Sequence, residues 1–158
     1  METRSSAADS ASAAHRPSPL SRLLVAGQLA LLAGLAATAA RPGPWAGALV
    51  VAGGILGLWA LAAMPLRQMR IVPEVHSRGR LVRSGPYRWI RHPMYSAVLL
   101  LAAGALATDP APFRLAMGIA LIAVLAAKLV REEKLLRSAY PDYAAYQADT
   151  WRLVPWIW

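Results

Sequence analysis

The feature that most limits what this chain can fold into is its series of long apolar runs. Two of them cover residues 20–40 and 45–64, and each matches the roughly 20 residues that a helix needs to cross a bilayer. Two more cover residues 94–108 and 113–130. Because the hydrophobic residues, 57% of the chain, are gathered into these runs, the sequence predicts an all-α integral membrane protein with about four transmembrane helices.

The third and fourth helices are predicted to differ in length. At about 1.5 Å per residue, the third would reach only about 22 Å, which is shorter than the roughly 30 Å hydrocarbon core. The fourth run continues without a breaker into a charged stretch, and Pro141 follows. We therefore expect the last helix to extend past the membrane to about Ala139, on the cytoplasmic side.

The first run allows two interpretations. Residues 1–19 are rich in Ala, Ser and Pro, and they are predicted to form a disordered cytoplasmic tail. The run after them is either a retained helix or the core of a secretory signal peptide, with Ala37-Thr38-Ala39 as its cleavage site. We favour the retained helix because the next turn, at residues 41–44, is as short as a tight helical hairpin requires.

The second run contains several glycines, which also allow two interpretations. Small residues let a neighbouring helix approach closely. Alternatively, they reflect the higher glycine content of membrane helices in general. The two interpretations carry equal weight for Gly47, Gly53, Gly54 and Gly57.

The net charge of +9 is spread unevenly over this predicted topology. The tail, the long loop at 65–93 and the C-terminal region share one side and carry fifteen of the 17 basic residues, whereas the opposite loops hold only Arg41 and Arg114. Since positive loops stay in the cytoplasm, both termini are predicted to be cytoplasmic, and the arginine-rich composition suggests a bacterial inner membrane. Arginines beside apolar runs orient helices and attract anionic membrane lipids, so no nucleic-acid partner is expected.

Several kinds of site find no support in the sequence. The absence of cysteine excludes a disulfide framework, a thiolate metal site and a cysteine nucleophile. No two histidines have helical spacing, so no metal site is predicted; they are His15, His76 and His92. No serine lies in a nucleophile elbow and no glycine-rich phosphate loop occurs, so neither hydrolysis nor phosphoryl transfer is expected.

A polar segment at residues 85–95 interrupts the apolar pattern. Gly85-Pro86 indicates a turn. Pro93 suits the first position of a helix and pushes His92 towards an extended conformation, so His92 is predicted to lie at the mouth of that helix. A helix mouth carries unpaired N–H groups, and with Arg91 beside it this one is a plausible place to hold an anionic group.

The charged end of the fourth helix carries two adjacent glutamates, Glu132 and Glu133. Neighbours on a helix point about 100° apart, so at most one of them can face fully into a pocket between helices. A carboxylate there could bind ribose hydroxyls or balance a cation. Spacing alone favours the alternative of a solvated surface, with Glu133 paired to Arg137 four residues on.

The C-terminal region, residues 140–158, is rich in tyrosine and tryptophan, which is typical of a membrane interface. Because it ends on Ile157-Trp158, we expect this segment to be docked on the protein. All the candidates for chemistry then fall at the same boundary of the membrane.

Four motifs together resemble one family. The run Gly-Pro-Tyr-Arg-x-x-Arg-His-Pro-x-Tyr at 85–95 resembles the isoprenylcysteine carboxyl methyltransferases and their bacterial relatives, which belong with the phospholipid methyltransferases. The later motifs match in order: Glu-Glu-x-x-Leu at 132–136, Tyr-Pro-x-Tyr-x-x-Tyr at 140–146 and Arg-Leu-Val-Pro at 152–155. The expected organisation is thus the tail at 1–19, a transmembrane hairpin at 20–64 and a methyltransferase core at 65–158.

This resemblance implies an S-adenosylmethionine-dependent methyltransferase that binds its cofactor at the cytoplasmic face. The catalytic residues implied are Arg152, which could hold an acceptor carboxylate, and Arg91. The acceptor implied is lipophilic, such as an isoprenylcysteine-like carboxylate. By motif position, the cofactor pocket would be lined by Tyr87, His92, Pro93, Tyr95, Glu132 and Glu133.

Two other functions stay open at this point. An NADPH-dependent membrane reductase of related fold would need basic residues for the 2′-phosphate, which Arg78, Arg80 and Arg83 could supply. A non-catalytic protein would use its basic and aromatic boundary only as a membrane anchor. Binding of S-adenosylmethionine, of NADPH or of neither separates the three.

Overall fold

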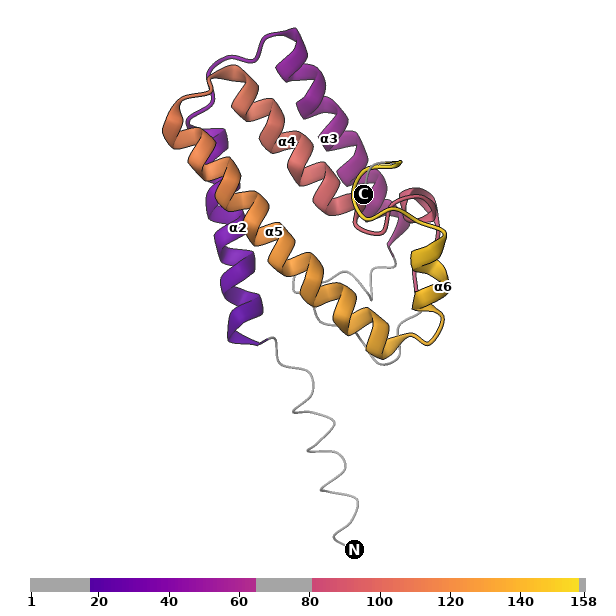
Figure 1. The fold of residues 1–158 in the computed structure, drawn as a ribbon. Helices are drawn as coiled ribbons and strands as arrows, with labels where there is room; N and C mark the ends of the chain where they lie inside the picture. Colours follow the sequence, from indigo (N-terminus) through magenta and orange to yellow (C-terminus); the bar gives the residue numbers. More distant parts are fainter. Residues whose placement is uncertain (1–17, 65–80, 157–158) are drawn as a thin grey trace, which may run out of the picture.

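The computed structural model describes residues 18–64 and 81–156. Its long helices run alternately in opposite directions, and the two short connections at 38–43 and 109–111 lie at the same end (Figure 1). No strand forms in the described ranges, so the predicted all-α fold is confirmed. The helices are α2 (Pro19–Ala37), α3 (Pro44–Ala63), α4 (Pro93–Thr108) and α5 (Pro112–Ala139).

Proline sets where each of these helices begins. A proline at the first helical position has no N–H group to leave unsatisfied, and its φ is already helical. Each helix therefore starts one residue before its predicted apolar run, at Pro19, Pro44, Pro93 and Pro112.

The lengths and surfaces of the helices fit a membrane. The helices α2, α3 and α5 are long and apolar enough to cross a bilayer, and α4, with 16 residues, is the short helix that the sequence predicts. The 28 residues of α5 confirm that the last helix is extended. Large apolar side chains point outward, with Leu23 and Leu58 69% and 71% exposed. Such a surface is stable only against lipid, so the protein is an integral membrane protein.

The helices pack as two pairs, α3 along α4 and α2 along α5 (Figure 1). Two glycines allow the first pair to come close: a Cβ atom on Gly53 of α3 or on Gly104 of α4 would lie 3.0 or 2.9 Å from a backbone carbonyl oxygen of the other helix. A Cβ atom on Gly57 would be in ordinary contact with the Ala97 Cβ atom at 3.5 Å. Gly47 and Gly54 have nothing within 4 Å of that position, so close packing explains Gly53 but not these two.

The two pairs meet around a small core of leucine and alanine side chains. Its fully buried members come from α2, α4 and α5 and are Leu35, Ala102, Leu121 and Leu125. The helix α2 therefore contributes to the same core as the helices that follow it.

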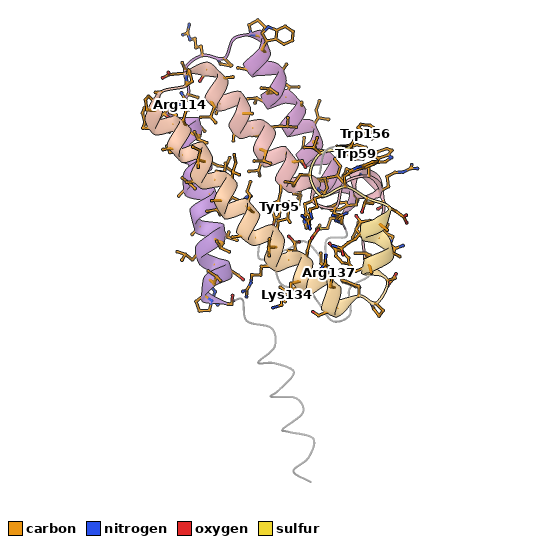
Figure 2. All side chains as sticks on the ribbon, in the orientation of Figure 1. Trp59, Tyr95, Arg114, Lys134, Arg137 and Trp156 are labelled. Atoms are coloured by element: carbon orange, nitrogen blue, oxygen red, sulfur yellow. The ribbon has the colours of Figure 1, made fainter. Side chains whose placement is uncertain are left out.

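The position of Arg114 corrects the sequence-based topology, which counted this residue as a loop charge. Arg114 lies in the first turn of α5 with 0% of its surface exposed (Figure 2). Its guanidinium group donates to the Thr38 carbonyl at 2.8 Å and to the Ala105 carbonyl. Carbonyls at helix C-termini lack partners within the helix. Arg114 therefore closes the ends of α2 and α4 and does not face solvent.

Several sequence predictions concern residues outside the described ranges. They are the disordered tail at 1–17, much of the polar loop at 65–80, and the terminal Ile157-Trp158. Within the described part, the turn at Gly85-Pro86 is a short 3-10 helix, η2 (Gly85–Arg88). The C-terminal region contains a short helix that the sequence did not predict, α6 (Tyr143–Ala148).

Candidate active site

The candidate site lies at the end of the bundle opposite the short connections. Here η2 and the start of α4 meet the charged end of α5 and the segment after α6 (Figure 1). The turn that brings the chain to this place requires glycine. Gly85 has a φ of +57°, and a Cβ atom on it would lie 2.7 Å from the Ala63 Cβ atom. Only glycine adopts that conformation without strain in so little space.

His92 lies at the mouth of α4, as predicted, with φ −124° and ψ 59°. The mouth offers fewer free N–H groups than the sequence suggested. Pro93 has none, and the N–H groups of Tyr95 and Ser96 donate to the His92 carbonyl at 3.0 and 3.1 Å. An anion-binding role for the helix mouth is therefore weakened, because its first turn largely satisfies itself.

The C-terminal segment docks beside this mouth through backbone hydrogen bonds. The Arg91 N–H group donates to the Trp151 carbonyl at 2.7 Å, and the His92 N–H group donates to the Arg152 carbonyl at 3.0 Å. The Ser96 hydroxyl donates to the Leu153 carbonyl at 2.6 Å. The predicted docking is thus confirmed for the part of this segment that the structure describes, and it places Arg152 next to His92.

Glu133 is the buried anion of the site, with 5% of its surface exposed. Its carboxylate accepts a hydrogen bond from Arg91 Nε at 3.0 Å, and Arg152 Nε lies 3.3 Å away. The solvated alternative, in which Glu133 pairs with Arg137, is wrong. Arg137 Nε donates instead to Gln147 Oε1 at 2.9 Å.

Glu132 faces the other ring nitrogen of His92 and is less buried, with 30% of its side chain exposed. The Tyr95 hydroxyl donates to Glu132 Oε2 at 2.8 Å. Figure 2 shows Tyr95 between α4 and α5. At most one of the two glutamates was predicted to point fully into the site. In agreement with this, Glu133 is enclosed, whereas Glu132 lies at the open edge of the site.

His92 joins the two carboxylates. Its Nδ1 atom lies 3.6 Å from Glu132 Oε2, and its Nε2 atom lies 3.6 Å from Glu133 Oε1. Both distances are too long for a hydrogen bond, and the buried Nε2 atom forms none with the described residues. The ring is stacked on that of Tyr95, with centroids 5.5 Å apart and planes 6° apart. The Nε2 atom of His92 therefore faces the enclosed carboxylate of Glu133, and Nδ1 faces Glu132 at the open edge.

Arg91 holds the site to the C-terminal segment. Besides Glu133, its guanidinium group donates to the Gln147 carbonyl at 3.1 Å and to the Thr150 carbonyl and hydroxyl. Sequence reasoning missed Gln147 and Thr150 because their contribution is mainly a carbonyl group, which any residue carries. No side-chain pattern could have identified them.

A tyrosine cluster supports the site from the side of α6. The Tyr146 hydroxyl donates to the Tyr87 carbonyl at 2.6 Å. Burial raises the pKa of Tyr146 to about 12, although the positive charges of Arg91 and Arg83 act to lower it. Burial also raises the pKa of Tyr87 and of Tyr143 above that of an ordinary phenol. These hydroxyls are neutral at physiological pH. The Tyr146 hydroxyl donates the hydrogen bond described above, whereas the buried Tyr143 hydroxyl has no hydrogen-bond partner among the described residues.

Metal chemistry finds no support in this geometry. In the part of the chain that the structure describes, no three His, Cys, Asp or Glu side chains are grouped so that they could hold an ion. The two carboxylates are engaged by basic groups and by a hydroxyl instead.

Comparison with known proteins adds a family to this geometry. Residues 44–143 match the family described as phospholipid methyltransferase. The chain is also 31% identical over 110 residues to the cobalt-zinc-cadmium resistance protein CzcN of Cupriavidus metallidurans. The aligned part is 68% of this chain and 50% of CzcN, so the chain spans about half the length of that relative. No solved structure matches the chain significantly.

Proposed function

Because this chain belongs to the phospholipid methyltransferase family, we propose that it is an integral membrane enzyme that transfers a methyl group from S-adenosylmethionine to a lipophilic acceptor. One observation carries the proposal. His92, at the start of α4, lies between Glu132 and Glu133 of α5 at one end of the bundle, and all three belong to the matched residues. The resemblance of these motifs to methyltransferases thus coincides with a buried polar site.

The cofactor would be held by the residues at the open edge of this site. A sulfonium cation is attracted by carboxylates, and Glu132, which the Tyr95 hydroxyl holds in place, would supply one. The Nδ1 atom of His92 lies on the side of Glu132 and would face a polar group of the cofactor, and Pro93 shapes the turn beside it. Glu132 is the better candidate for direct contact than Glu133, because part of its side chain is exposed.

The enclosed residues would act as positioning residues. The polar atoms of Glu133 and Arg91 are directed at each other, at Arg152 and at backbone carbonyls. Tyr87 supports the site through the hydrogen bond that its carbonyl accepts from Tyr146. These contacts fix the orientation of α4 relative to α5, and methyl transfer depends on such alignment.

Arg152 is the proposed residue on the acceptor side. Its Nε atom faces Glu133, and 34% of its side chain is exposed. A guanidinium group orients a carboxylate well through paired hydrogen bonds. If the acceptor is a carboxylate, one of its oxygens displaces the sulfur from the methyl carbon and no proton has to move. An isoprenylcysteine-like carboxylate is a compound of this type.

The location follows from the same arrangement. The site lies at the end of the bundle where α2 and α4 begin and α5 ends, which is the end that the basic residues predict to be cytoplasmic. The cofactor would then enter from the cytoplasm of a bacterial cell, and the acceptor would enter sideways from the inner membrane.

Calorimetric titration of the detergent-purified protein tests this proposal. We expect S-adenosylhomocysteine to bind with micromolar affinity and NADPH not to bind. Glu132→Gln should weaken that binding at least tenfold, whereas Asp109→Asn, an exposed carboxylate at the other end of the bundle, should leave it unchanged. Binding by neither ligand, in folded protein, would favour a non-catalytic anchor.

The reductase alternative is tested by the same titration. Of the three arginines that could hold a 2′-phosphate, Arg78 and Arg80 lie outside the described residues. Arg83 donates to Asp142 Oδ2 at 3.0 Å, so its charge is already paired. Binding of NADPH alone would refute the methyltransferase proposal and indicate a reductase.

A further inference from the structure

A second polar group lies deeper in the bundle than the site described above. Lys128 of α5 is only 2% exposed although it belongs to the apolar run of that helix. Its ammonium group donates to Gln28 Oε1 of α2 and lies 5.1 Å from the centroid of the Tyr95 ring. Tyr95 in turn donates to Glu132, so this group adjoins the proposed cofactor site.

The lysine side chain reaches across the bundle from α5 to α2. A Cβ atom on Gly27 would lie 4.0 Å from Val124 Cγ2, which places Gln28 about one helical turn deeper than the Cα atom of Lys128. The ammonium group therefore lies between Gln28 and the ring of Tyr95, which belongs to the first turn of α4. A lysine near the boundary of an apolar run normally extends towards water. Lys128 is instead buried and bonded to Gln28 inside the bundle.

The charge of this ammonium group is only partly compensated, by the Tyr95 ring and by the Glu132 carboxylate beyond ion-pair distance. It has three N–H donors, and among the described residues only the neutral amide of Gln28 accepts a hydrogen bond from it. No carboxylate in the described ranges forms an ion pair with it, and Glu132, four residues on, is bonded to Tyr95. A cation inside a membrane is costly without a partner and usually marks the path of a substrate or an ion.

We propose that Lys128 and Gln28 form a membrane-embedded site for an anionic group of the lipophilic methyl acceptor, and that this site, not Arg152, holds that group where the acceptor carries only one. The inference rests on the proposed methyltransferase function, because a lipophilic acceptor with its tail in the bilayer would present its head group at this depth, next to the cofactor. The anion takes the place that the amide oxygen of Gln28 holds in this structure. A carboxylate and a phosphate share the required chemistry.

Binding of matched amphiphiles to the full-length protein in neutral detergent, saturated with S-adenosylhomocysteine, tests the inference. The probes are oleate, oleyl phosphate and the neutral oleamide. We expect the wild-type protein to bind one of the two anions at least tenfold more tightly than oleamide, and the preferred anion identifies the group. Lys128→Met should reduce this preference to less than about twofold, whereas Lys134→Met, an exposed lysine of the same helix, should not change it (Figure 2).

A second variant keeps the test decisive if Lys128→Met does not fold. Gln28→Leu removes the neutral oxygen that competes with the anion, so the affinity for the preferred anion should rise at least threefold. A merely structural role for the pair would give no rise. Equal preference for the anions and oleamide in the wild-type protein, or the same preference in Lys128→Met, would overturn the inference.

The cofactor titration separates this inference from the function on which it rests. Both substitutions should leave the affinity for S-adenosylhomocysteine within twofold of the wild-type value. A tenfold loss in Lys128→Met would assign Lys128 to the cofactor site and overturn the inference. Absence of S-adenosylhomocysteine binding in the wild-type protein would instead refute the proposed methyltransferase function.

Discussion

Replacement of Glu133 by glutamine tests the internal charge balance of the site. The substitution keeps the shape of the side chain and one hydrogen-bond acceptor, but it removes the negative charge. Arg91 would then lose the anion 3.0 Å from its Nε atom, and Arg152 would lose the anion 3.3 Å from its own. Two cations would be left facing a neutral amide at a place from which water is largely excluded.

The expected magnitude follows from the burial of these groups. Removal of one partner of a buried ion pair costs about 3–5 kcal/mol. The side chains of Glu133 and Arg91 are 6% and 8% exposed, so that pair is buried on both sides. Glutamine can still accept a hydrogen bond from Arg91, and the partly exposed Arg152 can be hydrated. We therefore expect a loss at the lower end of this range, about 3 kcal/mol in the free energy of unfolding. In a chain of this size that corresponds to a fall of about 6–12 °C in the apparent melting temperature.

Thermal unfolding in detergent, followed by tryptophan fluorescence, measures this fall. The Trp151 N–H group donates to the Trp89 carbonyl beside the site. The emission of these two tryptophans should therefore change when the C-terminal segment separates from the site. Glu132→Gln serves as the matched comparison, because its carboxylate accepts one hydrogen bond from Tyr95 and is partly exposed. Its expected cost is about 1 kcal/mol, or about 2–4 °C.

The reasoning would be refuted by a fall of less than 2 °C in Glu133→Gln at unchanged helix content. A double-mutant cycle gives a second check. Because Arg91 and Glu133 form one pair, the loss in Arg91→Gln/Glu133→Gln should be smaller than the sum of the two single losses. Additive losses would show that the pair is not coupled.

The remaining predictions concern the supports of the bundle. Arg114→Met removes the hydrogen bonds that the buried guanidinium group donates to the Thr38 and Ala105 carbonyls, so it should cost about 1.5–3 kcal/mol in thermal unfolding, whereas exposed Arg41→Met at the same end should cost almost nothing. Gly85→Ala, at a φ of +57° and against Ala63, should cost at least about 1–2 kcal/mol, and Gly54→Ala, with open space around it, should not lower stability. The pKa of Tyr146, raised to about 12 in the folded protein by burial, implies that its contribution to stability is complete below pH 10 and is lost as the pH rises towards 12. The fall in melting temperature over that pH range should therefore be smaller in Tyr146→Phe, and an unchanged fall would contradict the assignment.

Much of the architecture could be predicted because its causes lie within single segments. An apolar run of bilayer length and a proline at its start act on the residues beside them, so the four helices begin one residue from their predicted positions. The turn at Gly85 is local in the same way, since a positive φ favours glycine. The extension of α5 follows from the absence of a breaker before Pro141.

The interior of the site could not be predicted in this way. On spacing alone, Glu133 seemed best paired with Arg137, because helix periodicity considers only neighbours on the same helix. The structure pairs it with Arg91, 42 residues away, and with Arg152. Arg114 was misplaced for the same reason, since its partners belong to two other helices.

The sequence by itself therefore determined the membrane class, the helices and the residue types gathered at one boundary, because hydrophobicity, proline and glycine act over a few residues. Only the tertiary structure decided which glutamate is enclosed, that Arg91 is held by backbone carbonyls, and that Lys128 turns inward to Gln28. The physical reason is that these charges gain their stabilisation from groups far away in the chain. Their orientation is set by how α2, α4, α5 and the C-terminal segment pack, which no local pattern contains.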